Sequence, residues 1–203
     1  MDKKVQFLGI VLPLFMMLIG AAPALSQARI VAIGTSFTNG HGVSRDESYP
    51  AVLERLLKSK GYNVVVDNDG VDGDSAAGGL ARLDQAVPSD TRVAIIEFGV
   101  NEYCANCSAH TFTDSDRAGV IPMLRTMVDR LSGRGVKVIL ISIHGVPVAA
   151  AAGGKARVVN MGTVLRNKPE YASGDRAGHP NAAGYAVAAA YVAPVVESLL
   201  GHK

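Results

Sequence analysis

Residues 30–40 of the chain read IVAIGTSFTNG, and this stretch is the main indication of the fold. Its first four residues are apolar, which is typical of a short strand buried on both faces of a parallel sheet. The glycine-flanked segment Gly34–Gly40 contains Ser, Thr and Asn, which favour turns for local reasons. Ligands of open parallel sheets bind beyond the carboxyl ends of the strands, so Ser36 is well placed to act as a nucleophile. An ordinary strand-to-helix turn is the alternative interpretation of these residues alone.

Strand and helix patterns alternate along the remainder of the chain. Strands are expected at residues 29–34, 62–67, 92–98 and 137–143, with a weaker fifth strand at 157–161. Helices are expected at residues 47–60, 75–87, 113–132 and 181–200, with disturbances at Pro122 and Pro194 and a possible N-cap at Asn181. Residues 68–74 form a turn-rich loop in this interpretation. The alternation predicts an α/β protein, a three-layer α/β/α sandwich around a parallel sheet of four to five strands with a flavodoxin-like arrangement.

The N-terminus has the layout of a secretory signal peptide. Lys3 and Lys4 precede an apolar run at residues 7–19, and small residues follow it up to Ala28. We expect cleavage after Ala24 or Ala28, which leaves a single domain at residues 29–203 without a stable membrane span. The mature protein would then be secreted or periplasmic, and an uncleaved N-terminal anchor is the alternative.

Composition narrows the classes of partner. The formal net charge of the whole chain is +2, which suggests neither a nucleic acid nor an acidic partner. The chain contains no Trp and only 5% aromatic residues, which argues against stacking on bases. We expect no cofactor, and the partner should be a small-molecule or lipid substrate.

Cys104 and Cys107 are the two cysteines of the chain. In an exported protein such a pair favours a small local disulfide. A thioredoxin-like redox motif has the same spacing but normally opens a helix near the start of its domain, whereas this pair follows a late strand. Two cysteines are also too few for a zinc site, and no metal is expected.

Four loops at one edge of the predicted sheet carry residues suited to acyl transfer. They contain Ser36, Gly73, Asn101 and His179. A serine needs a base to remove its proton, and histidine is the usual base. A developing oxyanion needs preorganised donors, which the backbone N–H groups of Ser36 and Gly73 and the side chain of Asn101 would supply.

These residues lie in segments that resemble the SGNH (GDSL-type) hydrolases, in particular the secreted bacterial arylesterase, thioesterase and lysophospholipase branch. The matching segments read GTSFTNG at 34–40, GVDGDS at 70–75, GGLARL at 78–83, GVN at 99–101 and HPNAAG at 179–184. The resemblance covers nearly all of the expected mature chain and implies the SGNH hydrolase fold. It also implies Ser36 as nucleophile, His179 as base and an oxyanion hole from Ser36, Gly73 and Asn101.

The chain departs from the family pattern at three places. Thr35 stands where the family has Asp before the nucleophile. Arg176 occupies the position three residues before the His where the family places its triad Asp, and Asp175 is one residue earlier. A one-residue loop shift would still bring Asp175 to the imidazole, and a Ser–His dyad or an impaired enzyme is the alternative. The segment between Ile143 and Ser173 is shorter than the family suggests, which leaves the acyl-chain preference open.

We therefore expect an exported serine ester hydrolase of the esterase, thioesterase or lysophospholipase type. A non-catalytic or impaired relative that binds acylated glycans or lipids is the alternative, followed by a carbohydrate O-acetylesterase or a flavodoxin-like module.

We expect the remaining histidines and acids of the loops to be surface or turn-forming residues. Three histidines, His41, His110 and His144, are read as loop or surface residues. Three acids in the predicted loop, Asp69, Asp72 and Asp74, are read as turn formers rather than calcium ligands, and Glu102 as a solvated loop charge.

Overall fold

A parallel five-stranded sheet forms the centre of the computed structural model, which describes residues 27–102, 114–175 and 177–201. The strands are β1 (Ala28–Gly34), β2 (Val64–Gly70), β3 (Thr91–Glu97), β4 (Lys137–Ser142) and β5 (Ala156–Asn160). Their order is β2-β1-β3-β4-β5, with every neighbouring pair parallel. All carboxyl ends therefore meet at one edge of the sheet, as the predicted fold requires.

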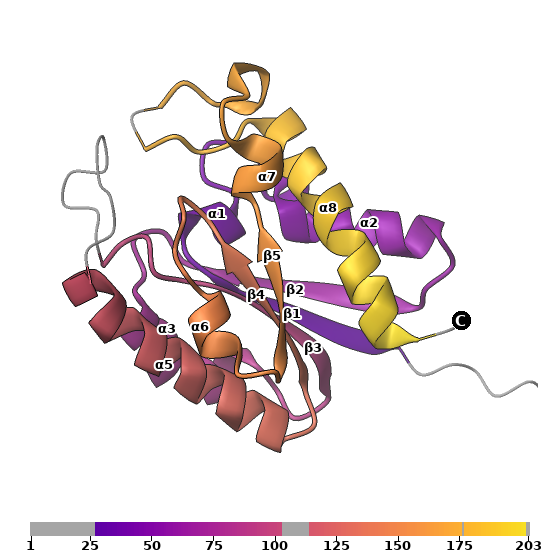
Figure 1. Ribbon diagram of the computed structural model, residues 1–203. Helices are drawn as coiled ribbons and strands as arrows, with labels where there is room; N and C mark the ends of the chain where they lie inside the picture. Colours follow the sequence, from indigo (N-terminus) through magenta and orange to yellow (C-terminus); the bar gives the residue numbers. More distant parts are fainter. Residues whose placement is uncertain (1–26, 103–113, 176, 202–203) are drawn as a thin grey trace, which may run out of the picture.

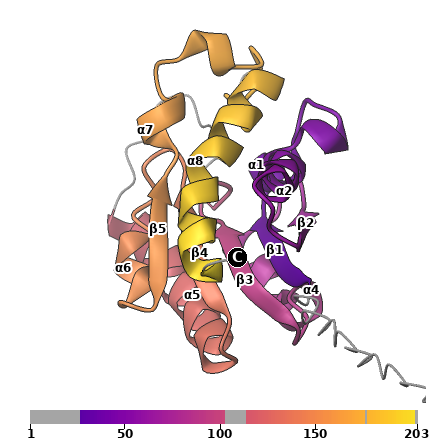
Figure 2. The same cartoon turned by 90° about the vertical axis from the view of Figure 1, so that its right-hand side faces the viewer.

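Helices cover both faces of this sheet (Figures 1 and 2). One face packs against α2 (Tyr49–Ser59) and α8 (Ala182–Leu200), and the other against α3 (Ala76–Ala81), α4 (Leu83–Ala86), α5 (Asp114–Gly133) and α6 (Ala149–Ala152). Short elements lie at or near the carboxyl edge: α1 (Ser36–Asn39), the 3-10 turn η1 (Arg45–Glu47), α7 (Gly162–Leu165) and the 3-10 turn η2 (Pro169–Tyr171). The predicted α/β/α sandwich is confirmed.

Two apolar clusters, one on each face of the sheet, form the core. Residues 30–34 of β1 are fully buried, because the strand is central and both of its faces are covered. Burial of such side chains contributes roughly 25 cal/mol per Å² of apolar surface. By length and composition α8 is apolar enough to cross a membrane, but its buried face packs in the core against α2 and the sheet.

Several boundaries differ from the sequence predictions. Strand β2 continues to Gly70, where a loop was expected, because residues 67–70 pair in register with residues 31–34 of β1. Tertiary pairing there outweighs the turn preference of the Asn and Asp residues. The helix expected at 75–87 is broken at Arg82 into α3 and α4, whereas Pro122 lies inside α5 without ending it. The elements α7 and η2 were not predicted.

Two predictions fall largely or wholly outside the described residues. The signal peptide begins in residues 1–26, and the proposed Cys104–Cys107 disulfide lies in residues 103–113. Both remain predictions. The described chain enters the sheet at Ala28, which pairs with Val64 of β2 and donates its N–H to the Asn63 carbonyl at 2.9 Å.

Candidate active site

A tightly packed turn holds Ser36 at the carboxyl end of β1. The strand ends at Gly34, and Ser36 begins the single turn of α1, which Gly40 closes with a left-handed φ of 92°. A Cβ atom on Gly34 would lie 2.3 Å from Thr38 Oγ1, and one on Gly40 would lie 2.5 Å from Ser48 Cβ. Both positions therefore require glycine, and the close packing fixes the half-buried Ser36.

His179 reaches this serine from the loop before α8. Its Nε2 atom lies 2.8 Å from Ser36 Oγ, and its Nδ1 atom lies 2.6 Å from Asp175 Oδ2. Asn181 begins the helix immediately afterwards, and its side chain accepts the Gly184 N–H at 2.9 Å. The N-cap thus fixes the end of the loop that carries His179.

The four-residue spacing between Asp175 and His179 closes a compact loop. Asp175 Oδ1 accepts the backbone N–H of His179 at 3.0 Å, while the other oxygen faces the imidazole. Ser173 also donates its N–H to the His179 carbonyl at 2.9 Å. An acid four residues before His179 therefore lies directly against the histidine ring.

These contacts keep Asp175 ionised. Burial acts to raise the pKa of Asp175, but the hydrogen bonds from the His179 ring and backbone outweigh it and hold the pKa at about 2. A negative charge beside Nδ1 stabilises an imidazolium and selects the tautomer that leaves Nε2 free to accept a proton.

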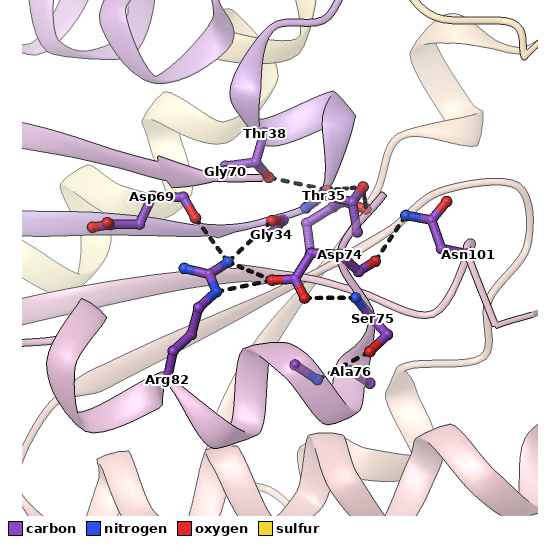
Figure 3. Close-up of polar contacts among 12 residues, drawn as sticks. Gly34, Thr35, Thr38, Asp69, Gly70, Asp74, Ser75, Ala76, Arg82 and Asn101 are labelled. Atoms are coloured by element: carbon purple, nitrogen blue, oxygen red, sulfur yellow. Dashed lines mark hydrogen bonds and ion pairs between the residues drawn. The ribbon is translucent and has the colours of Figure 1, made fainter. Parts of the chain in front are cut away.

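Asn101, on the loop after β3, reaches Asp74 on the loop after β2, which also carries Gly73 (Figure 3 shows Asn101 and Asp74). Asn101 Nδ2 donates to the Asp74 carbonyl at 2.8 Å, which joins the loop after β3 to the loop after β2. Gly73 has a positive φ of 76°. Asn101 lines the cavity beside Ser36, whereas Gly73 is not among the residues that line it.

Arg82 fixes the loop after β2 from below (Figure 3). Its Nε atom donates to Asp74 Oδ2 at 2.8 Å, and its guanidinium also donates to the Asp69 carbonyl at 3.0 Å. The loop acids have different partners, since Asp74 pairs with Arg82 and Asp72 accepts from His41 and Asn39. The turn-forming acids do not converge on one point.

Glu97, at the end of β3, is a buried acid that the sequence analysis missed. It is 1% exposed, and it accepts the N–H of Thr35 at 3.0 Å and the hydroxyl of Thr38 at 3.0 Å. Burial raises the pKa of Glu97 to about 7, although these hydrogen bonds oppose the shift. The signal in the sequence is an acid that directly follows the apolar residues 93–96 of a buried strand.

A cavity of about 330 Å³ opens beside Ser36 and His179. Its wall includes the apolar side chains of Val100, Ile143, Met161 and Leu165. His144 is an exposed loop residue, as expected from the sequence; it lies in this wall and has a positive φ of 50°. A serine, a histidine and an apolar cavity wall thus share one site.

Two side chains read as ordinary loop residues have specific partners. The ring centroid of His41 lies 4.5 Å from that of His179, and His41 Nδ1 lies 2.5 Å from Asp72 Oδ2. Glu102 is half-buried, and its Oε1 atom accepts the Ala76 N–H at the start of α3. The interpretation of Glu102 as a solvated charge is therefore wrong, because this hydrogen bond holds its carboxylate against the start of α3.

Comparisons with known proteins place the chain in a family. An arylesterase of Vibrio mimicus is 28% identical over 127 residues, which cover 61% of this chain and 60% of the relative. Esterase TesA of Pseudomonas aeruginosa is 26% identical over 116 residues, which cover 57% and 54% of the two chains. The chain thus matches less than two thirds of the length of either relative.

A solved structure resembles this chain over nearly the full length of that structure. The SGNH-hydrolase family esterase AlinE4 is 26% identical, with a TM-score of 0.63, and the match covers 87% of this chain and 98% of AlinE4. The model of the GDSL-like lipase/acylhydrolase family matches residues 32–160, which include Ser36, Gly73 and Asn101. The match extends over more than half of the sequence, and the chain belongs to the GDSL-like lipase/acylhydrolase family.

Proposed function

We propose that the protein is an exported serine ester hydrolase that acts through an acyl-enzyme on Ser36. The observation that carries this proposal is the continuous line of contacts from Asp175 through His179 to Ser36, at 2.6 and 2.8 Å. Nucleophile, base and orienting acid in hydrogen-bond contact are the parts that acyl transfer requires. Membership of the family and the adjoining cavity support the same assignment.

In the first half of the reaction, His179 Nε2 accepts the hydroxyl proton of Ser36 as Oγ attacks the ester carbonyl carbon. The negative charge of Asp175 stabilises the imidazolium that forms. The tetrahedral oxyanion is held by the N–H groups of Ser36 and Gly73 and by Asn101 Nδ2, which still has one N–H beyond its bond to Asp74. His179 then donates its proton to the departing alcohol or thiol, and the acyl group stays on Ser36.

In the second half, His179 removes a proton from water, and the hydroxide attacks the acyl-enzyme carbonyl. The same three donors hold the second oxyanion. Its collapse returns the proton from His179 to Ser36 Oγ and releases a carboxylic acid. Every proton therefore passes through one imidazole, which is why its orientation by Asp175 matters.

The cavity favours esters with a short or medium acyl or aryl group. Its volume of about 330 Å³ is near the lower end of the range for small-molecule sites. Met161 and Leu165 offer an apolar surface to a hydrocarbon chain. A small-molecule or lipid ester fits this cavity.

Export is supported by the N-terminal sequence pattern, and the start of β1 bears on the cleavage position. Cleavage after Ala24 would leave β1 whole, whereas cleavage after Ala28 would remove its first residue. We therefore favour Ala24 as the cleavage position. N-terminal sequencing of the mature protein from the exported fraction tests this choice.

Replacement of the nucleophile tests the chemistry. We expect Ser36→Ala to lower the hydrolysis of p-nitrophenyl esters by on the order of 10⁴-fold or more, with an unchanged thermal unfolding midpoint. A fluorophosphonate should label Ser36 in the wild-type protein and nothing in the variant. Ser59→Ala, which removes an exposed hydroxyl at the end of α2, is the matched control and should behave as wild type. Wild-type activity in Ser36→Ala would contradict the assignment, and inactivity of the wild type on every ester would favour the non-catalytic relative.

A further inference from the structure

Two histidine–carboxylate pairs lie side by side at the mouth of the site. One is the His179–Asp175 pair described above. The other consists of His41 and Asp72, whose Nδ1 and Oδ2 atoms are 2.5 Å apart. The two rings are 4.5 Å apart between centroids and are tilted by 37°. Catalysis by the first pair does not require the second.

We propose that His41, His179 and Asp175 form a binding site for a borderline divalent transition-metal ion such as Zn²⁺. Each of the three residues offers one ligand atom, and these atoms lie within 4.8 Å of one another. Ligands of a tetrahedral Zn²⁺ lie about 2.1 Å from the metal and hence roughly 3.4 Å from one another. Side-chain rotations on the order of 1 Å therefore suffice to close the site around the ion.

The donor set and its surroundings suit Zn²⁺ rather than a hard cation. Two imidazoles and one carboxylate match the ligands of zinc sites, whereas Ca²⁺ and Mg²⁺ prefer oxygen ligands alone. Asp72 holds the Nδ1 side of His41, which leaves Nε2 as the ligand atom. A carboxylate behind a histidine is the usual outer support of a metal ligand. Together, the carboxylates of Asp72 and Asp175 place two negative charges around the site.

The position of the residues permits access and adjustment. The side chain of His41 is 47% exposed, and that of Asp72 is 44% exposed, so an ion reaches them directly from water. The side chain of His179 is 15% exposed and is the most fixed of the three ligands. Three protein ligands leave a fourth position for water.

Metal binding at this site would stop the proposed reaction, a consequence that rests on the proposed function. Asp175 faces Nδ1 of His179, so an ion held by both residues binds Nδ1 and displaces the hydrogen bond between them. An imidazole whose Nδ1 holds the ion keeps its proton on Nε2 and can no longer accept one from Ser36. The inhibition should be reversible, because removal of the ion restores the hydrogen bonds.

Calorimetric titration of the Ser36→Ala protein with Zn²⁺ tests the site without any reliance on activity. We expect Ser36→Ala to bind the ion, and the double variant Ser36→Ala/His41→Asn to bind it at least about tenfold more weakly. Replacement of Asp72 by Asn should weaken binding by roughly tenfold, since outer support of a ligand is worth 10- to 100-fold in affinity. His144→Asn removes a histidine of the neighbouring cavity wall and should leave Zn²⁺ binding unchanged. Thermal unfolding of each variant shows whether it is folded.

Inhibition is then measured on the active protein. Zn²⁺ should inhibit ester hydrolysis by the wild type, a chelator should restore it, and His41→Asn should raise the inhibition constant at least about tenfold relative to its own uninhibited rate. Equal Zn²⁺ binding by the proteins with and without His41 would overturn the site, because ions held by the cysteines or by other histidines are retained in both. Loss of binding in His144→Asn would overturn it as well. If Zn²⁺ binding depends on His41 but the protein hydrolyses no ester, the metal site is supported and only the proposed function is rejected.

Discussion

Two carboxyl groups lie near the site of Ser36, and their surroundings differ. Asp175 belongs to the exposed loop before α8, where His179 donates to one of its oxygens and faces the other with its ring. Glu97 belongs to the end of β3, where it is buried and accepts hydrogen bonds from Thr35 and Thr38. The pKa of Asp175 is about 2, and that of Glu97 is about 7.

The difference shows which effect dominates at each place. Both carboxylates accept several hydrogen bonds, and these favour the ionised form in both cases. Burial acts to raise the pKa of both groups, but at Asp175 the hydrogen bonds from His179 together outweigh burial, whereas at Glu97 burial outweighs the hydrogen bonds. The carboxyl beside the base therefore keeps its charge throughout the neutral range. The carboxyl beneath the turn that carries Ser36 changes its charge near neutral pH.

Loss of the charge on Asp175 should have the largest effect. In Asp175→Asn an amide would donate to Nδ1 of His179 and favour the wrong tautomer, while the charge that stabilises the imidazolium is gone. We expect kcat for p-nitrophenyl ester hydrolysis to fall by on the order of 10³- to 10⁴-fold, with the fold retained.

Glu170→Gln provides the control for Asp175→Asn. Glu170 is an exposed acid of the same segment, and its nearest cation, Lys168, is 4.0 Å away, so its removal should change kcat less than about twofold. If Asp175→Asn retained more than about a tenth of the wild-type kcat, the protein would have to operate as a Ser36–His179 dyad.

Ser36, His179 and Asp175 were accessible from the sequence as candidate site residues, and the buried Glu97 was not. Ser36 and His179 follow recognisable local patterns, a buried strand that ends in glycine and a helix N-cap. In the structure His179 lies between Ser36 and Asp175 and contacts both. The contacts of Glu97 and His41 come from segments far apart in the chain, so no local residue spacing predicts them.

The same distinction holds for the fold. The strands were predicted because long apolar runs in a parallel sheet carry a strong signal, and the sheet was found with the expected elements. The extension of β2 to Gly70 was missed, since polar residues at a sheet edge pair only when a neighbouring strand is present. Short elements such as α7 depend on tertiary packing and have almost no periodicity of their own.

The second largest effect should be the pH dependence of the unfolding free energy, which distinguishes Glu97 from Asp175. The pKa of Glu97 is raised in the folded protein, so its contribution to stability is fully present below roughly pH 4 and is lost as the pH rises through about 7. The pKa of Asp175 is lowered, so its contribution is present above roughly pH 4 and is lost as the pH falls through about 2. The two groups therefore act in different pH windows and in opposite directions.

Urea unfolding of the wild type and Glu97→Gln measures the Glu97 contribution. Between roughly pH 4 and pH 8 the wild type should lose on the order of 3 kcal/mol of unfolding free energy relative to the variant, which corresponds to the shift of its pKa to about 7. Asp175→Asn should follow the wild type across this window. Parallel curves for the wild type and Glu97→Gln would mean that Glu97 titrates near its ordinary pKa despite its burial.

The smallest expected effect comes from one hydrogen bond to Glu97. Thr38 is fully buried, and its hydroxyl donates to Glu97 Oε2 at 3.0 Å. Thr38→Val keeps the shape of the side chain and removes this donor, which should lower the unfolding free energy by about 1–2 kcal/mol at pH 8. Thr38→Ser keeps the donor and serves as the control for the hydroxyl.

The cost of Thr38→Val should depend on pH. The hydroxyl of Thr38 stabilises the ionised form of Glu97, so its removal raises the pKa of Glu97 further. The loss of unfolding free energy should therefore be larger at pH 8, where Glu97 is charged, than at pH 5, where it is protonated. An equal loss at both pH values would show that Thr38 does not stabilise the charge, and burial alone would then determine how Glu97 differs from Asp175.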